Sequence, residues 1–156
     1  MRHVGRNRRF PVREGMTAGQ VIAEKGRGPE LAILLVEDEH YLRLAGQRLL
    51  GLIGYQVVTV ADGQEALELL SSGDVEVDLV LSDVVMPNLS GKDLHKALQT
   101  LPDAPPILFT SGSSRSDLQG EHLLDPSLPL VSKPWDMTEL AGKIHEVLAL
   151  ATGEAN

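Results

Sequence analysis

The chain has 156 residues, of which 42% are hydrophobic, and this is enough for one domain with a buried core. A formal net charge of −8 and an aromatic content of 3% argue against a nucleic-acid-binding body. The absence of cysteine excludes disulfides, thiolate metal sites and cysteine nucleophiles, and no apolar run approaches the roughly 18 residues that a membrane span needs.

Residues 1–30 differ in charge from the rest of the chain. They contain seven Arg and Lys against three Asp and Glu, a balance of +4, whereas residues 31–156 contain seven against nineteen, a balance of −12. Glycine and proline interrupt this segment and it has no apolar period, so we predict a basic, flexible extension. A short helix over residues 17–25 and a basic arm that contacts acidic partners are the alternatives.

From residue 31 onward, strand-like and helix-like patterns alternate. The apolar run over residues 31–36 is typical of a strand buried on both faces, and apolar residues then recur at helical spacing over 41–53. A second strand is predicted over 56–61. Asp62 is expected to cap the helix that follows, and Gly73 to end it.

The third and fourth units follow the same order. A strand is predicted over 78–83 and a helix over about 91–101, with Ser90 as its N-cap. Residues 107–110 form the fourth predicted strand. The stretch from 113 to 127 carries glycine, proline and few apolar residues, so only a short, loosely packed helix is expected there.

A fifth unit completes the pattern, with a short strand over 128–131 and a helix over about 137–150 that Asp136 caps. Five successive strand–helix units predict an α/β fold with a doubly wound parallel sheet and helices on both faces. We therefore expect an extension over 1–30, one domain over 31–151 and a short tail over 152–156.

Chemically useful side chains stand where the predicted strands end. They are Glu37 and Asp38 after the first strand, Asp83 in the third, Thr110 and Ser111 in the fourth, and Lys133 after the fifth. The carboxyl ends of parallel strands meet at one edge of the sheet, where ligands bind. Each element alone is more often an ordinary loop, cap or turn, so the prediction depends on their joint occurrence.

Clustered carboxylates repel one another unless a cation lies among them, and an all-oxygen ligand set favours Mg²⁺ over Zn²⁺. A carboxylate beside Mg²⁺ can attack phosphorus and form an acyl phosphate. A lysine and a hydroxyl can then stabilise the charge on the phosphoryl oxygens. The pattern therefore indicates phosphoryl transfer to an aspartate.

Four segments carry a resemblance to a known family: ILLVEDE at 33–39, LVLSDVVMP at 79–87, LFTSG at 108–112 and VSKP at 131–134. As a set they resemble the response-regulator receiver family of two-component signalling, from residue 31 to about 150. The resemblance implies a flavodoxin-like (βα)5 fold with strand order 2-1-3-4-5. It also implies that Glu37, Asp38, Asp83 and the backbone carbonyl of Val85 hold Mg²⁺, that Asp83 is the phosphoacceptor and that Lys133 is the conserved lysine.

The hydroxyl has two candidates, Thr110 and Ser111, because only one of two adjacent strand residues can face the site. The family places Ser or Thr directly before a small residue, and Ser111 precedes Gly112. We therefore predict Ser111, with Thr110 as the fallback. The chain departs from the family at Leu130, where an aromatic switch residue is usual.

The resemblance further implies a phosphodonor, which is a histidine kinase or a histidine phosphotransfer protein, and signalling to a downstream protein by conformational change. Only residues 151–156 follow the last predicted helix, so no DNA-binding output domain is expected and output would act in trans. We expect a cytoplasmic protein without membrane association. It would form and hydrolyse only its own acyl phosphate and would not otherwise act as an enzyme. A homodimer is possible under this interpretation. A phosphorylation-independent adaptor is the main alternative. An aspartyl phosphatase is disfavoured, because Val85 stands where its second acid is needed.

Overall fold

A computed structural model of the protein describes residues 31–153. The predicted basic extension over 1–30, its alternative helix and positions 154–156 of the predicted tail lie outside the described residues. The strands are β1 (Ala32–Val36), β2 (Gln56–Val60), β3 (Leu79–Asp83), β4 (Ile107–Ser111) and β5 (Leu130–Ser132). The helices are α2 (His40–Ile53), α3 (Gly63–Ser72), α4 (Gly91–Leu98), α5 (Arg115–Gly120) and α6 (Met137–Thr152).

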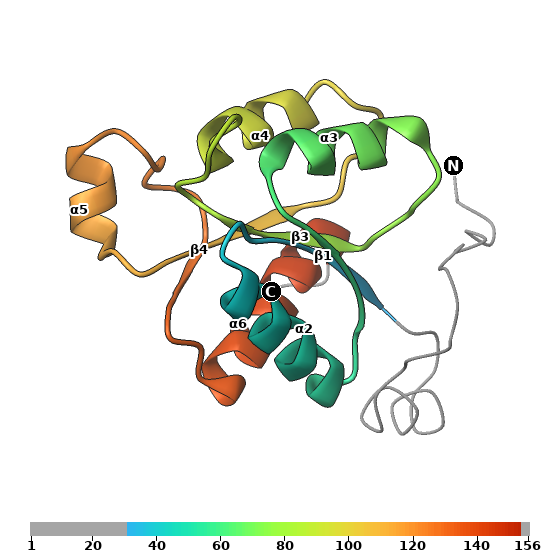
Figure 1. Ribbon diagram of the computed structural model, residues 1–156, viewed down its shortest axis with the longest axis horizontal. Coiled ribbons are helices and arrows are strands. Elements are labelled where there is room, and N and C mark those ends of the chain that lie inside the picture. Colours follow the sequence, from blue (N-terminus) through green and yellow to red (C-terminus); the bar gives the residue numbers. More distant parts are fainter. Residues whose placement is uncertain (1–30, 154–156) are drawn as a thin grey trace.

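The strands form one sheet in the order β2-β1-β3-β4-β5, and all four pairings are parallel. Helices α3 and α4 cover one face of this sheet, and α2 and α6 cover the other (Figure 1). The predicted doubly wound, flavodoxin-like fold and its strand order are therefore confirmed.

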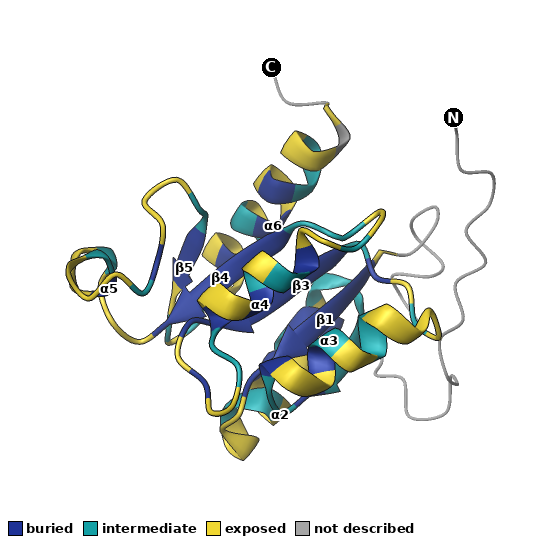
Figure 2. Cartoon of the chain, turned by 90° about the horizontal axis from the view of Figure 1, so that it is seen from above, coloured by how far each residue is buried: buried dark blue, intermediate teal, exposed yellow. Residues whose placement is uncertain are grey.

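The central strands are buried on both faces, which is why they read as continuous apolar runs (Figure 2). Alternate residues of β1 enter different cores. Leu34 packs with Ala66 and Leu94 beneath α3 and α4, whereas Leu35 packs with residues of α2 and α6 such as Leu50. Each core therefore needs its own set of strand positions.

Side-chain caps begin the helices. Asp62, Ser90 and Asp136 each accept a hydrogen bond from the backbone N–H three residues later, as the sequence predicts. Gly73, in a left-handed conformation with φ of 80°, ends α3. Local sequence therefore accounts for these element boundaries.

Other boundaries differ from the predictions. Helix α4 ends at Leu98 rather than near residue 101, because the next N–H groups, of Thr100 and Leu101, bond to carbonyls three residues back in a tightened turn. Strand β5 starts at Leu130 instead of 128, and α6 continues to Thr152 instead of about 150. The predicted short fourth helix is present as α5, six residues long. Within the described part of the chain, no helix combines the length and apolarity that crossing a membrane requires.

Candidate functional site

Three strands end at the same edge of the sheet and bring charged side chains there. Asp83 is the last residue of β3, Glu37 follows β1, and Lys133 follows β5. The sheet ladder extends one residue beyond two of these strands, since Glu37 N–H donates to Val60 and Lys133 N–H donates to Ser111. The backbone that carries the site is therefore an extension of the rigid sheet.

Lys133 links the three strand ends. Its ammonium group donates to Glu37 Oε1 at 2.7 Å and to Asp83 Oδ2 at 3.0 Å, and its side chain is only 12% exposed. Charge-assisted hydrogen bonds of this length are stronger than neutral ones, and partial burial limits their screening by salt. Lys133 therefore ties β5 to both β1 and β3.

Burial and neighbouring charge shift the ionisation of this group. Burial raises the pKa of the Glu37 carboxyl, and the charge of Asp83 adds to this, while hydrogen bonds from Lys133 and from the backbone N–H of Glu39 offset only part of it. Burial alone would lower the pKa of Lys133, but its hydrogen bonds to Glu37 and Asp83 and their charges outweigh that effect and raise it overall. Lys133 thus stays protonated at neutral pH. A further cation beside Glu37 would stabilise the ionised form of its carboxyl group.

The acidic side chains can share an ion. Glu37, Asp38 and Asp83 each offer one carboxylate oxygen, and these oxygens all lie within 4.8 Å of one another. Three carboxylates and the Lys133 ammonium leave a formal charge of −2, which a divalent cation would balance. Mg²⁺ prefers oxygen ligands and usually binds only a few protein groups, with water filling its other positions. The three carboxylates therefore fit the predicted metal.

Thr110 and Ser111, the two candidate hydroxyls, have different partners. Thr110 stands opposite Asp83 in the sheet, and its Oγ1 accepts a hydrogen bond from the Trp135 indole N–H at 2.8 Å. The Ser111 Oγ instead accepts from the backbone N–H of Ser113 at 3.0 Å. Each hydroxyl accepts one hydrogen bond and keeps its own O–H free to donate, so these contacts do not decide between them and Ser111 stays a prediction.

Arg43, Gly91 and Trp135 shape the site but were not singled out by the sequence pattern. The Arg43 guanidinium donates to the backbone carbonyl of Glu37 at 2.8 Å, which holds the loop after β1. A Cβ on Gly91 would lie 2.7 Å from the Asp83 carbonyl oxygen, so only glycine lets α4 start so close to β3. Trp135 packs against Gly46 of α2. The position of Gly91 directly after the capping Ser90 could have indicated its role. No local sequence feature marks Arg43 or Trp135.

Comparison with known proteins agrees with this arrangement. The family model described as the response regulator receiver domain matches residues 33–145. The chain is 38% identical over 117 residues to the sensor kinase CckA of Brucella abortus. The alignment covers 74% of this chain and 12% of CckA. The chain is also 38% identical over 118 residues to the transcriptional regulatory protein CpxR of Escherichia coli K12, covering 74% of this chain and 48% of CpxR.

A solved CheY-like receiver domain from Methylobacillus flagellatus has a similar structure, with a TM-score of 0.64 and 28% sequence identity, covering 76% of this chain and 99% of that one. The chain spans less than half the length of each of these two curated relatives. The activities of the whole relatives are therefore not assigned to this chain.

Proposed function

This chain belongs to the response-regulator receiver family, and from that membership and its acidic edge we propose that Asp83 accepts a phosphoryl group from a histidine kinase or a histidine phosphotransfer protein. The observation that carries the proposal is the hydrogen bond from Lys133 to Asp83, within a group of carboxylates that can share one divalent ion. Glu37, Asp38, Asp83 and the backbone carbonyl of Val85 would hold Mg²⁺.

The proposed reaction is an in-line displacement at phosphorus. An Asp83 carboxylate oxygen forms the new P–O bond while the P–N bond to the donor histidine breaks, and the electron pair returns to the imidazole. When bound, Mg²⁺ supplies positive charge to the phosphoryl oxygens. Lys133 exchanges its Asp83 contact for a phosphoryl oxygen, and Ser111 donates its hydroxyl to another.

An exposed apolar stripe on α2 supports the proposed donor. Tyr41, Leu44 and Leu52 are 75%, 48% and 54% exposed, and their spacing places them along one side of the helix. The exposed Arg48 lies on the same side, between Leu44 and Leu52. Helix α2 begins only three residues after Glu37, so the stripe starts beside the acidic edge. We propose that a helical, apolar surface of the phosphodonor docks here.

Signalling would proceed without an aromatic switch. Leu130 stands at the switch position and packs in the core beneath α3 and α4, with 9% of its surface exposed. We propose that phosphorylation instead shifts the loops after β4 and β5, which carry Ser111 and Lys133, and that a downstream protein reads that change. We propose that turnover is limited to the domain's own acyl phosphate, which makes the domain a signalling module rather than an enzyme. A cytoplasmic location is a separate part of the proposal.

Small-molecule donors test the proposal without knowledge of the kinase. The wild-type chain is incubated with acetyl phosphate or phosphoramidate, with Mg²⁺ or with EDTA, and its intact mass is measured. We expect a gain of one phosphoryl group that requires Mg²⁺. No gain with either donor would favour the phosphorylation-independent adaptor.

Removing Asp38 should weaken Mg²⁺ binding. In Asp38→Ala the cluster loses one of three carboxylates, and we expect the Mg²⁺ dissociation constant to rise at least about tenfold. Calorimetry, or the fluorescence of Trp135, the chain's single tryptophan, measures this. Asp74→Ala, an exposed aspartate outside the cluster, is the matched control. Equal affinities in Asp38→Ala and wild type would remove Asp38 from the metal site.

Removing Lys133 should affect metal binding in the opposite direction. Lys133→Ala frees carboxylate oxygens of Glu37 and Asp83 and makes the cluster more negative, so Mg²⁺ should bind severalfold more tightly. The phosphorylation rate should nevertheless fall by at least about tenfold, because a stabilising cation is missing from the transition state. Circular dichroism should show a folded domain; an unfolded variant would indicate a structural role instead.

A further inference from the structure

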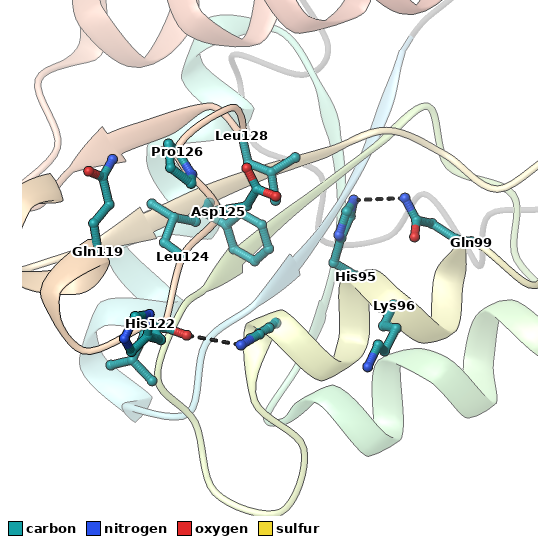
Figure 3. Close-up of a pocket in the computed structure, with 12 residues that line it drawn as sticks. His95, Lys96, Gln99, Gln119, His122, Leu124, Asp125, Pro126 and Leu128 are labelled. Carbon is teal, nitrogen blue, oxygen red and sulfur yellow. Dashed lines mark hydrogen bonds between the residues drawn. The ribbon is translucent and has the colours of Figure 1, made fainter.

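A second concave site lies away from the acidic edge. A pocket of about 620 Å³ opens between α4, which carries His95 and Lys96, and the segment that follows α5, which carries Leu124 and Leu128 (Figure 3). Phe109 of β4 also lines it. None of the residues that line it belongs to the acidic edge. Its volume falls in the range of about 300–1,000 Å³ that is typical of small-molecule sites.

The short fourth helix explains why the pocket exists. Helix α5 ends at Gly120 after six residues, and it stands apart from α4 in both Figure 1 and Figure 2. The loop over residues 122–128, rather than a longer helix, therefore forms the second wall. This loop is anchored, since Lys92 Nζ of α4 donates to the His122 carbonyl at 3.0 Å and Arg115 donates to Leu128 at 3.0 Å.

The pocket floor is apolar. Phe109 and Leu124 are almost fully buried, and Leu123 and Leu128 are half-buried beside them. The His95 ring stands edge-on to Phe109, with 6.3 Å between ring centroids, and a hydrogen bond to Gln99 orients it. The two buried side chains support the floor from beneath, and a hydrophobic ligand body would meet the partly exposed Leu123 and Leu128.

The rim carries two lysines and one acid, a formal balance of +1, although the described domain is strongly acidic. Lys92, Lys96, His95 and His122 line the pocket, and Asp125 is the one acid among its lining residues. The Asp125 carboxylate accepts hydrogen bonds from the backbone and hydroxyl of Ser127 at 2.8 Å, which lower its pKa, and the charge of His95 adds a smaller contribution in the same direction. Within residues 31–153, the Lys96 ammonium has no hydrogen bond or ion pair. Figure 3 shows its side chain directed away from Leu124, so the exposed lysine reaches a ligand by rotating its side chain.

His122 adds a backbone observation. Its φ of 58° lies in the left-handed region, which costs a non-glycine residue roughly 1 kcal/mol and persists where surrounding contacts hold it. The Lys92 hydrogen bond to its carbonyl is one such contact. The conformation sets the direction of the loop wall and places His122 on the rim.

We propose that this pocket binds a small organic anion, with its ring or branched hydrocarbon body against Leu123 and Leu128 and its carboxylate, sulfonate or phosphate at Lys96. The charge of the rim and the walled, limited volume favour a small molecule over a protein segment. This site is separate from Asp83, and its occupation does not depend on phosphoryl transfer.

Anilinonaphthalene sulfonate, an aromatic body with one anionic group, is the test probe. Fluorescence titration of the wild-type chain should give saturable binding. Lys96→Gln should weaken binding about fivefold, as expected for loss of one partly exposed ion pair. N-phenylnaphthylamine, which lacks the sulfonate, should bind both proteins equally. Gln119→Trp, which places a large ring at the pocket wall, should reduce binding of both probes while the melting temperature stays unchanged.

Lys143→Gln is the control, because Lys143 is a partly exposed lysine on α6 outside the pocket, where it lies 4.0 Å from Glu146. It should leave the affinity for the sulfonate probe unchanged. In NMR spectra, amide shifts on titration should fall within residues 92–99 and 119–128. Equal weakening in both lysine variants, shifts centred on Tyr41 and Leu44, or no saturable binding would overturn the proposal. Tight binding of an acidic peptide without binding of the probe would also overturn it.

Discussion

Asp83→Ala is expected to take up no phosphoryl group from acetyl phosphate or phosphoramidate with Mg²⁺, whereas the wild-type chain takes up one. Asp83 is 8% exposed at the end of β3, and its carboxylate contacts the Lys133 ammonium at 3.0 Å. No other carboxylate of the cluster is the last residue of a central strand. Alanine leaves no nucleophilic oxygen at that position, so the mass gain should vanish completely.

This loss should not come from unfolding. In Asp83→Ala, Lys133 keeps its 2.7 Å hydrogen bond to Glu37, and one carboxylate fewer repels its neighbours in the absence of metal. Thermal melting in EDTA should therefore show a variant at least as stable as wild type. Asp83→Asn keeps an oxygen that can accept from Lys133, and it should behave likewise. Phosphorylation of either variant at the wild-type level would place the acceptor elsewhere.

Gly91→Ala is expected to destabilise the domain by about 2–3 kcal/mol, which corresponds to a fall in melting temperature of about 10 °C. The added Cβ would lie 2.7 Å from the carbonyl oxygen of Asp83 and 2.8 Å from Cε1 of Phe109. Because one of these atoms belongs to the backbone, the start of α4 or the end of β3 must move. The rate of phosphorylation should also fall, since the acceptor is carried on that backbone.

Gly142→Ala is the matched control for this variant. Gly142 lies within α6, and a Cβ there would meet no atom within 4 Å. Alanine is the better helix former by about 0.5–1 kcal/mol, so this variant should melt above the wild-type protein. Thermal melting of both variants, followed by circular dichroism, measures the two expected changes in melting temperature. A Gly91→Ala domain that melts with wild type would show that α4 adjusts freely, contrary to the close packing described.

Most of the fold could be read from local pattern. The run over 32–36 is apolar at every position because both faces of β1 are covered, and this also distinguishes it from an edge strand. The capping side chains of Asp62, Ser90 and Asp136 mark helix starts, since each satisfies an N–H within three residues. The end of α4 was wrong by a few residues, because a tightened turn carries similar residues to a helix.

The acidic edge was predictable for a topological reason. Parallel strands end on the same side, so Glu37, Asp83 and Lys133 had to approach one another once the sheet order was inferred. The choice between Thr110 and Ser111 had no such basis in the residues. The partner of Thr110, the Trp135 indole, lies 25 residues further along the chain, and no local pattern indicates that pairing.

Local pattern alone thus established the order of strands and helices, the parallel sheet and the set of charged side chains at its edge, because periodicity, caps and chain connectivity are properties of neighbouring residues. Tertiary packing decided the rest: that Lys133 bonds to both Glu37 and Asp83, that Gly91 lies against β3, and that a cationic pocket opens beside α4. These features depend on distances between segments far apart in sequence. Such distances are set only when side chains fill the space between the sheet and its helices.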